Sequence, residues 1–328
     1  MNIIEVELLS KIFKSGKKAV DDLTFNVKQG EIFGFLGPNG AGKSTTIRML
    51  TTLSKPTSGR ATLVGYDLLR ETAKIRQSIG YVAQEPGVDL NATGRENLVL
   101  QGNMFHLPRK IIYERVDELL KLVELKDDAD RLVRTYSGGM KKRLDIATGL
   151  IHRPKLLFLD EPTTGLDPHT RSHLWEYIKK LNREEGITIF LTTHYLEEAD
   201  KLSERVAIID FGRIVAEGNP DTLKDEITGD TIKLQLEDKT EGNLNRASTL
   251  LGTQSIVKET KIVEQYLRVW VNRGADNLPE IFRFLEGANI RIQSVEVAHP
   301  SLDDVFLKYT GRSLRDSSGE TNSSREVV

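Results

Sequence analysis

The sequence predicts an α/β domain with a helical insert, followed by a small α+β domain. Over the first two-thirds of the chain, short apolar runs alternate with helical patterns, as is typical of α/β proteins. A glycine-rich loop at residues 37–45 lies between an apolar run and a helix-compatible stretch. Beyond residue 230 the expected order of elements is βαββαβ, which is that of a ferredoxin-like sandwich.

The composition bounds the class of protein. A chain of 328 residues is long enough for two domains, and each could bury its own core. Lys and Arg number 46 against 48 Asp and Glu, so the overall charge gives no reason to expect a nucleic-acid partner. Cysteine is absent, which excludes disulfides, thiolate metal sites and cysteine nucleophiles. No apolar run approaches the ~20 residues that cross a bilayer, and no leader pattern opens the sequence, so we expect a cytosolic chain.

The first domain is expected over residues 1–218. Its candidate strands are Glu5–Leu9, Thr24–Val27, Ile32–Leu36, Ile79–Val82, Leu156–Asp160, Thr188–Leu191, Val206–Ile209 and Arg213–Ala216. The last two flank a Phe211-Gly212 turn and are therefore expected to be adjacent. Residues 85–136, between the candidate strands Ile79–Val82 and Leu156–Asp160, have a helical pattern. Within it, Ile112, Val116 and Leu119 recur at the spacing of one helix face.

A break at Gly218-Asn219-Pro220 opens a polar connecting segment, 219–230, and a second domain is expected over 231–310. Its candidate elements are a strand at Ile232–Leu236, a helix at Leu244–Leu251, strands at Ser255–Val257 and Tyr266–Val271, a helix at Leu278–Leu285, a strand at Ile290–Val297 and a short helix at Leu302–Tyr309. Residues 311–328 are almost devoid of apolar side chains, and we expect a disordered tail.

The glycine-rich loop matches the GxxxxGK[ST] phosphate-binding pattern. Its residues are Gly37, Pro38, Asn39, Gly40, Ala41, Gly42, Lys43, Ser44 and Thr45. In a strand–loop–helix context the glycines let backbone N–H groups converge on an anion, at which the helix points its positive end. Lys43 would reach the β- and γ-phosphates, and the Ser44 hydroxyl would ligate Mg²⁺. An ordinary glycine-rich turn is the alternative, and the flanking elements disfavour it. The loop predicts binding of a nucleoside triphosphate.

Two carboxylates, Asp160 and Glu161, end the apolar run that begins at Leu156. In open α/β sheets, ligands gather at the carboxyl ends of strands. Asp160 would hold Mg²⁺ there through water, and Glu161 would polarise the water that attacks the γ-phosphate. An acidic pair that only starts the next turn is the alternative, and the phosphate-binding loop makes it the weaker one.

Four further signals are weak one by one. Ser137, Gly138 and Gly139 precede a helical stretch and alone are explained by a serine N-cap with two permissive glycines. Gln84 follows the strand that ends at Val82, Asp167 follows the acidic pair, and His194 follows the apolar run that begins at Ile189. Their order and spacing, taken together with the phosphate-binding loop and the acidic pair, indicate a particular class of protein.

With this set of motifs the chain resembles the ATP-binding subunits of ABC transporters, over roughly Ile3 to Gly218. The resemblance implies that GPNGAGKST is the Walker A loop and LLFLDE is Walker B. It implies that Gln84 is the Q-loop glutamine, which contacts Mg²⁺ and the attacking water and senses the membrane partner. Ser137, Gly138 and Gly139 match the signature motif, Asp167 the D-loop aspartate, and His194 the switch histidine. Phe13 matches an aromatic residue that stacks on adenine, with a core position as the alternative.

The signature departs from the family's commonest LSGGQ, because Tyr136 replaces the Leu and Met140 the Gln. This puts in doubt any hydrogen bond made by the fifth side chain, whereas the phosphate-facing residues are kept. The pattern YSGGM is similar to that of a subfamily of drug-exporter ATPases of the daunorubicin-resistance type. The run from Pro300 to Phe306 resembles the closing motif of the same subfamily.

The resemblance implies an ATP-hydrolysing subunit that energises export through separate transmembrane permease subunits, with ATP and Mg²⁺ as cofactors. Two chains would pair head to tail, each ATP lying between Walker A of one chain and the signature motif of the other. Glu161 would act as base, His194 would orient the γ-phosphate and water, and Lys43 and Ser137 would stabilise charge. The subunit would lie on the cytoplasmic face of the membrane, and the permease would dock near Gln84 and the helical insert.

Two other functions remain open. One is an importer ATPase with a regulatory C-terminal domain, which the βαββαβ pattern disfavours. The other is a soluble ABC ATPase that works on nucleic acid or ribosomes; such proteins usually have tandem cassettes, long coiled coils or zinc-binding cysteines, which this sequence lacks. A structural role is the favoured interpretation of the small domain. His152, His169 and His173 are interpreted as surface or packing residues, because no set of ligands converges on them.

Overall fold

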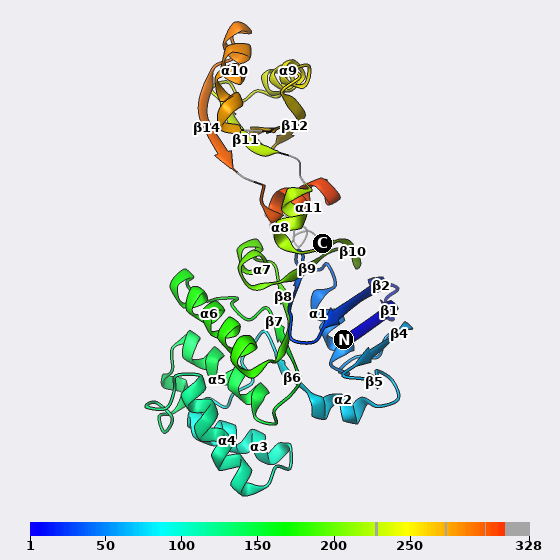
Figure 1. Cartoon of the computed structure of the whole chain (residues 1–328), viewed down its shortest axis with the longest axis vertical. Coiled ribbons are helices and arrows are strands. Elements are labelled where there is room, and N and C mark those ends of the chain that lie inside the picture. The colour runs from blue at the N-terminus through cyan, green and yellow to red at the C-terminus, as the bar shows by residue number, and fades with distance from the viewer. Residues whose placement is uncertain (227–228, 273, 299, 312–328) are drawn as a thin grey trace, which may run out of the picture. The chain divides into compact units, whose positions relative to one another are not determined.

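The computed structural model describes residues 1–226, 229–272, 274–298 and 300–311, so the expected tail lies outside the described residues apart from Gly311. The chain divides into two compact units, the first running from Met1 to Pro220 and the second beginning at Asp221 (Figure 1). Among the described residues, the structure contains no helix with the length and apolar character that a membrane span requires.

A six-stranded sheet forms the centre of the first unit. Its order is β10-β9-β3-β8-β7-β6, and the strands are β3 (Ile32–Leu36), β6 (Ile79–Val82), β7 (Leu156–Asp160), β8 (Thr188–Thr193), β9 (Arg205–Asp210) and β10 (Arg213–Gly218). All neighbours are parallel except β10, which returns antiparallel to β9. Every residue of β3 and β7 is buried, which explains their continuous apolar runs. The predicted bounds of β3, β6 and β7 are confirmed.

A second, antiparallel sheet has the order β2-β1-β4-β5. Its strands are β1 (Asn2–Ile12), β2 (Lys18–Lys28), β4 (Ser58–Leu63) and β5 (Tyr66–Asp67). β1 and β2 are longer than predicted, and β4 and β5 were not predicted. β4 has only two buried residues, Ala61 and Leu63, so its apolar pattern is too short to indicate a strand. It forms because it pairs with β1.

The core of this unit lies on both faces of the six-stranded sheet. Helix α1 (Lys43–Leu50) and the antiparallel sheet cover one face, while α5 (Gly138–Leu150) and α6 (Pro168–Glu185) cover the other (Figure 1). On the first face Phe33 and Phe190 lie 5.5 Å apart between ring centroids, and Phe25 stacks on Phe33 at 5.8 Å. Helices α2 (Thr72–Ser78) and α7 (Leu196–Leu202) are short elements that precede β6 and β9.

The predicted helical insert contains α3 (Gly94–Met104), α4 (Arg109–Leu122) and a 3₁₀ turn at Val133–Thr135, and α5 follows it. Thr93 caps α3 by accepting a hydrogen bond from the Glu96 N–H, and the Glu96 side chain accepts one from the Thr93 N–H. Ile112, Val116 and Leu119 are buried on one side of α4, so the predicted helix face is confirmed.

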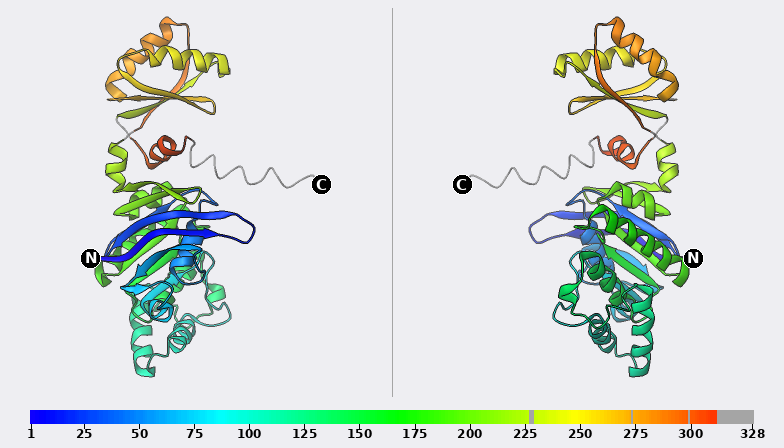
Figure 2. Two further views of the ribbon diagram at one scale, coloured as in Figure 1. Left: turned by 90° about the vertical axis from the view of Figure 1, so that its right-hand side faces the viewer. Right: turned by 90° about the vertical axis from the view of Figure 1, so that its left-hand side faces the viewer.

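The second unit begins within α8 (Pro220–Asp225), a helix in the segment that was expected to be a plain polar connection. Its other elements are β11 (Asp230–Leu236), α9 (Glu241–Gly252), β12 (Val257–Val263), β13 (Tyr266–Val271), α10 (Gly274–Gly287), β14 (Ile292–Ala298) and α11 (Leu302–Thr310). The antiparallel sheet has the order β12-β13-β11-β14, and Figure 2 shows α9 and α10 on one side of it. This is the ferredoxin-like arrangement. The strand predicted at Ser255–Val257 was misplaced, because β12 begins at Val257 and has only one fully buried residue.

Candidate functional site

The phosphate-binding loop connects β3 to α1 and depends on glycine at position 42. Gly42 is the N-cap residue of α1 and has a φ of 110°, in the left-handed region. A Cβ atom there would lie 2.5 Å from the carbonyl oxygen of Ala19, which is a clash with backbone. Glycine therefore lets the chain turn into α1 with its first N–H groups free to bind an anion.

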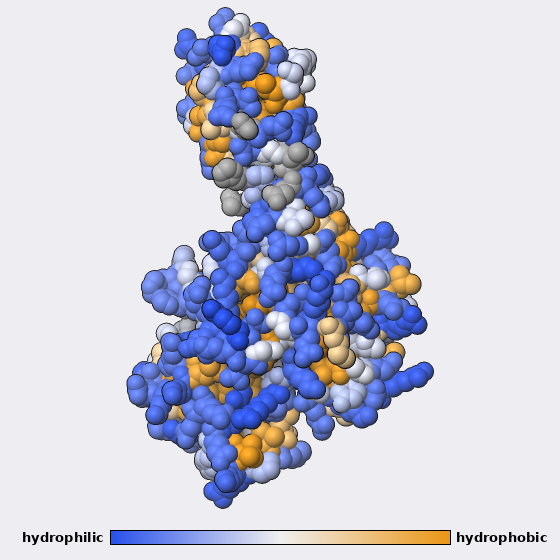
Figure 3. Space-filling model, in the orientation of Figure 1, coloured by the Kyte–Doolittle hydropathy of each residue, from blue (hydrophilic) through white to orange (hydrophobic). Residues whose placement is uncertain are grey.

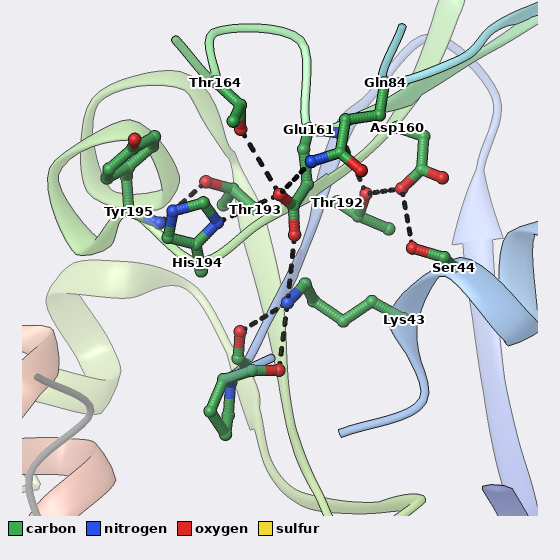
Figure 4. A network of polar contacts seen from close by, with 12 residues as sticks. Lys43, Ser44, Gln84, Asp160, Glu161, Thr164, Thr192, Thr193, His194 and Tyr195 are labelled. Carbon is green, nitrogen blue, oxygen red and sulfur yellow. Dashed lines mark hydrogen bonds and ion pairs between the residues drawn. The ribbon is translucent and has the colours of Figure 1, made fainter. Parts of the chain in front are cut away.

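Lys43 is buried at the centre of the site (Figure 4). Its Nζ donates hydrogen bonds to the carbonyl oxygens of Gly37 at 2.7 Å and Pro38 at 3.0 Å. The same Nζ lies 3.2 Å from Oε1 of Glu161 in an ion pair. Burial lowers the pKa of Lys43, and the Glu161 carboxylate opposes that shift. Two loop carbonyls and one carboxylate thus compensate the buried ammonium charge.

Asp160 and Ser44 bring two oxygen ligands together at the carboxyl end of β7. Oδ1 of Asp160 accepts a hydrogen bond from the Ser44 hydroxyl at 3.3 Å and one from Thr192 Oγ1 at 2.6 Å. The Thr192 bond fixes the carboxylate from the neighbouring strand β8. A carboxylate beside a hydroxyl is the oxygen donor set that suits Mg²⁺, which binds few protein groups and keeps several waters.

Glu161 is the centre of the polar network in Figure 4. Its Oε2 accepts hydrogen bonds from Gln84 Nε2 and Thr164 Oγ1, both at 3.3 Å, and lies 3.1 Å from Nδ1 of His194. Its backbone N–H donates to the Thr192 carbonyl oxygen at 3.1 Å. Its φ of 46° is unusual for a residue other than glycine, and the contacts around Glu161 hold the backbone there.

The ionisation of Glu161 results from opposing effects. Burial raises the pKa of the carboxyl group, but the hydrogen bond from His194 and the positive charge of Lys43 outweigh it. The pKa of Glu161 is lowered to about 2. The side chain is therefore a carboxylate at neutral pH while Lys43 remains its partner.

One cavity of about 400 Å³ is lined by half of the predicted nucleotide-binding residues. It is lined by Phe13, Lys17, Ala19, Asn39, Gly40, Gly42, Lys43, Ser44, Thr45, Gln84 and Glu161. Phe13 is 44% exposed, so its ring is accessible for stacking and is not a core residue. The fold thus brings four separate segments of the sequence to one cavity.

The signature residues Ser137 and Gly139 line a different cavity. Ser137 is the N-cap of α5, where its hydroxyl accepts a hydrogen bond from the Met140 N–H at 3.3 Å. Ser137 and Gly139 line a cavity together with His169 and Thr170 of α6. Asp167 is the N-cap of α6 and accepts a hydrogen bond from the Thr170 N–H at 3.0 Å. Lys43 does not line this cavity.

Sequence reasoning missed several residues of this site. Thr192 donates a hydrogen bond to Asp160, and Thr164 donates one to Glu161. In the sequence, the only indication of these roles is a hydroxyl residue inside or just after an apolar run. Lys142 and Asp145, one turn apart on α5, are buried beneath the segment that contains Gln84. Burial lowers the pKa of Lys142 and raises that of Asp145 to about 6. Buried charges inside an amphipathic helix cannot be distinguished from surface charges by periodicity alone.

A largely parallel sheet with a phosphate-binding loop after β3 and two carboxylates at the carboxyl end of β7 defines a P-loop ATPase. The family model described as "ABC transporter" matches residues 20–164, and the one described as "ATP-binding protein DrrA1-3-like, C-terminal domain" matches residues 218–310. The chain belongs to the ABC transporter ATP-binding proteins of the daunorubicin-resistance type, as its motifs had indicated. It is accordingly an ATP-binding and ATP-hydrolysing protein.

Relatives and solved structures agree with this assignment. The daunorubicin resistance ATP-binding protein DrrA3 of Streptomyces coeruleorubidus is 42% identical over 299 residues, covering 91% of this chain and 93% of the relative. The linearmycin resistance ATP-binding protein LnrL of Bacillus subtilis is 39% identical, covering 96% of this chain and all of the relative. The structure of cbiO1 from Clostridium perfringens, part of an ABC transporter complex, is 33% identical with a TM-score of 0.65, covering 69% of this chain and 91% of that structure. The ATP-binding cassette MJ0796, solved as a dimer bound to ADP and Pi, is 29% identical with a TM-score of 0.59, covering 66% of this chain and 98% of that structure.

Proposed function

We propose that this chain is the ATPase subunit of a membrane exporter, working on the cytoplasmic face with separate permease subunits. The observation that carries the proposal is the meeting of Lys43, Gln84 and His194 on the Glu161 carboxylate beside the phosphate-binding loop. The relatives support export over import, because their names refer to resistance against daunorubicin and linearmycin. Another, from Sinorhizobium fredii, is a Nod factor export protein and is 38% identical over 314 residues, covering 95% of this chain and 87% of the relative.

In this mechanism Glu161 is the general base for the attacking water. A carboxylate with a pKa of about 2 is a weak base, and both the hydrogen bond from His194 and the ion pair with Lys43 lower the pKa of Glu161 in this state. When ATP binds, Lys43 turns to the β- and γ-phosphates and its charge no longer stabilises the carboxylate. The pKa of Glu161 then rises, and the side chain becomes able to accept a proton from water. Nucleotide binding thereby activates the base.

The other residues orient the reactants. His194 and Gln84 hold Oε2 of Glu161, which leaves Oε1 to face the position that Lys43 occupies before ATP binds. Asp160, Ser44 and Gln84 would ligate Mg²⁺, which neutralises charge on the phosphate oxygens when it is bound. Phe13, at the edge of the same cavity, would stack on the adenine ring.

Two chains are required for a complete site in this proposal. Ser137 and Gly139 line a cavity that Lys43 does not line. One chain therefore cannot bring its signature residues and its Lys43 to the same phosphate. A head-to-tail dimer with two-fold symmetry places the signature residues of each chain over the phosphate-binding loop of the other. ATP contacts both surfaces only in the closed dimer and therefore favours closure. The MJ0796 structure, which is dimeric, supports the pairing of two chains.

A mixing experiment tests the head-to-tail arrangement. The variants Lys43→Ala and Ser137→Ala are each expected to lack turnover, because every site in their homodimers has lost one half. In a mixed dimer one site combines both defects and the other is intact. Random pairing therefore restores up to about a quarter of wild-type sites. Mixing Lys43→Ala with Glu161→Gln is the control and restores none, since both residues belong to the same half. An absence of recovery in the first mixture, with mixed dimers demonstrated by differential tags, would contradict the arrangement.

The permease is proposed to dock on the helical insert. Leu100 is 54% exposed and Met104 66% exposed on α3, and Ile111 is 44% exposed on α4. Figure 3 shows apolar surface over this end of the first unit. Clusters of exposed apolar side chains mark interaction sites more often than scattered ones do. The double variant Leu100→Ser/Met104→Ser should bind ATP normally and lose co-purification with native membranes. Leu53→Ser, at a leucine of similar exposure outside the insert, is the control. If only this control variant lost membrane association, the helical insert would not be the docking site.

A further inference from the structure

The segment at residues 83–87 lies between β6 and α3 and has no regular secondary structure. Its backbone polar groups have no partners from a helix or a strand ladder. Residues 84–87 are exposed, but two buried side chains of α5 form hydrogen bonds with backbone groups of the segment. Nζ of Lys142 donates to the carbonyl oxygen of Ala83 at 2.7 Å and to that of Gln84 at 3.3 Å. Oδ1 of Asp145 accepts a hydrogen bond from the Gly87 N–H at 3.0 Å.

These two side chains are oppositely charged and buried next to each other. Lys142 and Asp145 are each only 4% exposed, and Nζ of Lys142 lies 3.9 Å from Oδ2 of Asp145. Burying two charges costs about as much free energy as their attraction returns, so apolar residues of similar size would serve stability as well. A buried pair of this kind is better explained by the alignment that it fixes between the parts of the fold around it. In this protein the pair fixes the position of the segment 83–87 relative to α5.

The segment contains the glutamine that contacts the catalytic base. Lys142 holds the backbone carbonyl of Gln84, while the side-chain amide of the same residue donates to Oε2 of Glu161 at 3.3 Å. The signature residue Ser137 is the N-cap of the helix that carries Lys142. A rigid helix thus connects the N-cap serine, through Lys142, to the contact between Gln84 and Glu161. A displacement of about 1 Å in such a contact is enough to lower turnover substantially.

We infer that Lys142 and Asp145 are positioning residues that tie the signature helix α5 to the Gln84 segment and so place the Gln84 amide on the Glu161 carboxylate. Through this clamp, occupation of the signature motif of one chain by the ATP of the other is transmitted to the catalytic base of the first chain. The inference rests on the proposed function, because it uses the role of Glu161 in hydrolysis.

The test combines isosteric variants with Gln84→Ala. Lys142→Met should lower kcat about tenfold while the Kd for ATP stays within about twofold, because the phosphate-binding loop is untouched. Lys142→Arg retains donors for the two carbonyls and should recover part of kcat. In the Gln84→Ala background, Lys142→Met should cause no further loss, since both changes break the same link. Lys141→Met, on the adjacent lysine that points elsewhere on the helix, is the matched control.

A second variant separates positioning from folding. Lys142→Met/Asp145→Leu replaces the buried pair by apolar residues and is expected to keep the wild-type Tm while kcat remains low. Losses of kcat that multiply in the Gln84→Ala/Lys142→Met double variant would overturn the inference, as would wild-type kcat in the apolar double variant. Wild-type turnover in Gln84→Ala would overturn it as well and leave Glu161 as the base. Wild-type turnover in Glu161→Gln would instead remove the proposed function.

Discussion

Lys43 and Glu161 form a buried ion pair in which Nζ lies 3.2 Å from Oε1. One partner comes from the start of α1 and the other from the residue after β7, so the pair connects the phosphate-binding loop to the proposed catalytic base. Each charge is compensated inside the protein by the other. A nucleotide that attracts Lys43 would therefore change the environment of Glu161, and in the proposed mechanism this change couples binding to catalysis.

Glu161→Gln should bind ATP and fail to hydrolyse it. The amide fills the same space but cannot accept a proton from water, so turnover is expected to fall by about 10²–10⁴. Closed dimers should accumulate in ATP and Mg²⁺, because hydrolysis no longer opens them. Phosphate release and size-exclusion chromatography measure the two effects. Glu197→Gln, at an exposed position on α7, is the control, and equal turnover in both variants would remove Glu161 from its role.

Lys43→Ala should weaken nucleotide binding itself. The variant loses charge-assisted hydrogen bonds to the phosphates, each worth about 1.5–3 kcal/mol, so the Kd for ATP should rise by at least about tenfold. Isothermal titration calorimetry measures this change. Lys17→Ala is the matched control, because Lys17 lines the same cavity from an exposed position. Similar affinity of the two variants would contradict the assignment of the phosphate-binding loop.

Tyr136→Phe should lower stability and leave ATP binding intact. The Tyr136 hydroxyl donates a hydrogen bond to the carbonyl oxygen of Asp128, and the side chain is 4% exposed. Removing the donor leaves a carbonyl without this partner, at a cost of about 1–3 kcal/mol in the free energy of unfolding. Urea denaturation measures the loss. Tyr113→Phe, on a half-exposed tyrosine of α4, should change stability far less, and equal losses would show that the Asp128 bond is not responsible.

His152 should make stability fall in mild acid. Burial lowers its pKa; the ring stacks on Phe105 at 3.8 Å, and Nε2 lies 2.9 Å from the carbonyl oxygen of Ile79. The unfolded chain takes up a proton near the ordinary pKa of about 6.5, before the folded chain does. Stability is therefore fully present above that pH and is lost as the pH falls through the lowered folded pKa.

A comparison of Tm values between pH 7.5 and 5.5 tests this dependence. His152→Gln can keep the hydrogen bond to Ile79 but has no proton to gain, so its Tm should fall less than that of the wild type over this range. Its Tm should be lower at pH 7.5, because the stacking on Phe105 is lost. Parallel curves for the two proteins would show that His152 does not titrate in this way.

Much of the site could be predicted because its chemistry is local in sequence. The run from Gly37 to Thr45 contains the turn, the cation and the hydroxyl of the phosphate site within nine positions, and its flanking apolar runs indicate a strand and a helix. Asp160 and Glu161 end a fully buried strand, and that position alone places them at the ligand-binding edge of the sheet. The motifs also indicated the family that the comparisons then showed.

The primary structure alone predicts the phosphate-binding groups and the two carboxylates at the end of a strand, because glycine content and apolar runs act over a few neighbouring residues. How those groups are held depends on the three-dimensional packing. Thr192 supports Asp160 because β8 lies beside β7, and Lys142 holds Gln84 because α5 packs beneath a loop far from it in sequence. Such contacts follow from strand order and helix packing, which depend on the whole core and leave no periodic signal at either residue.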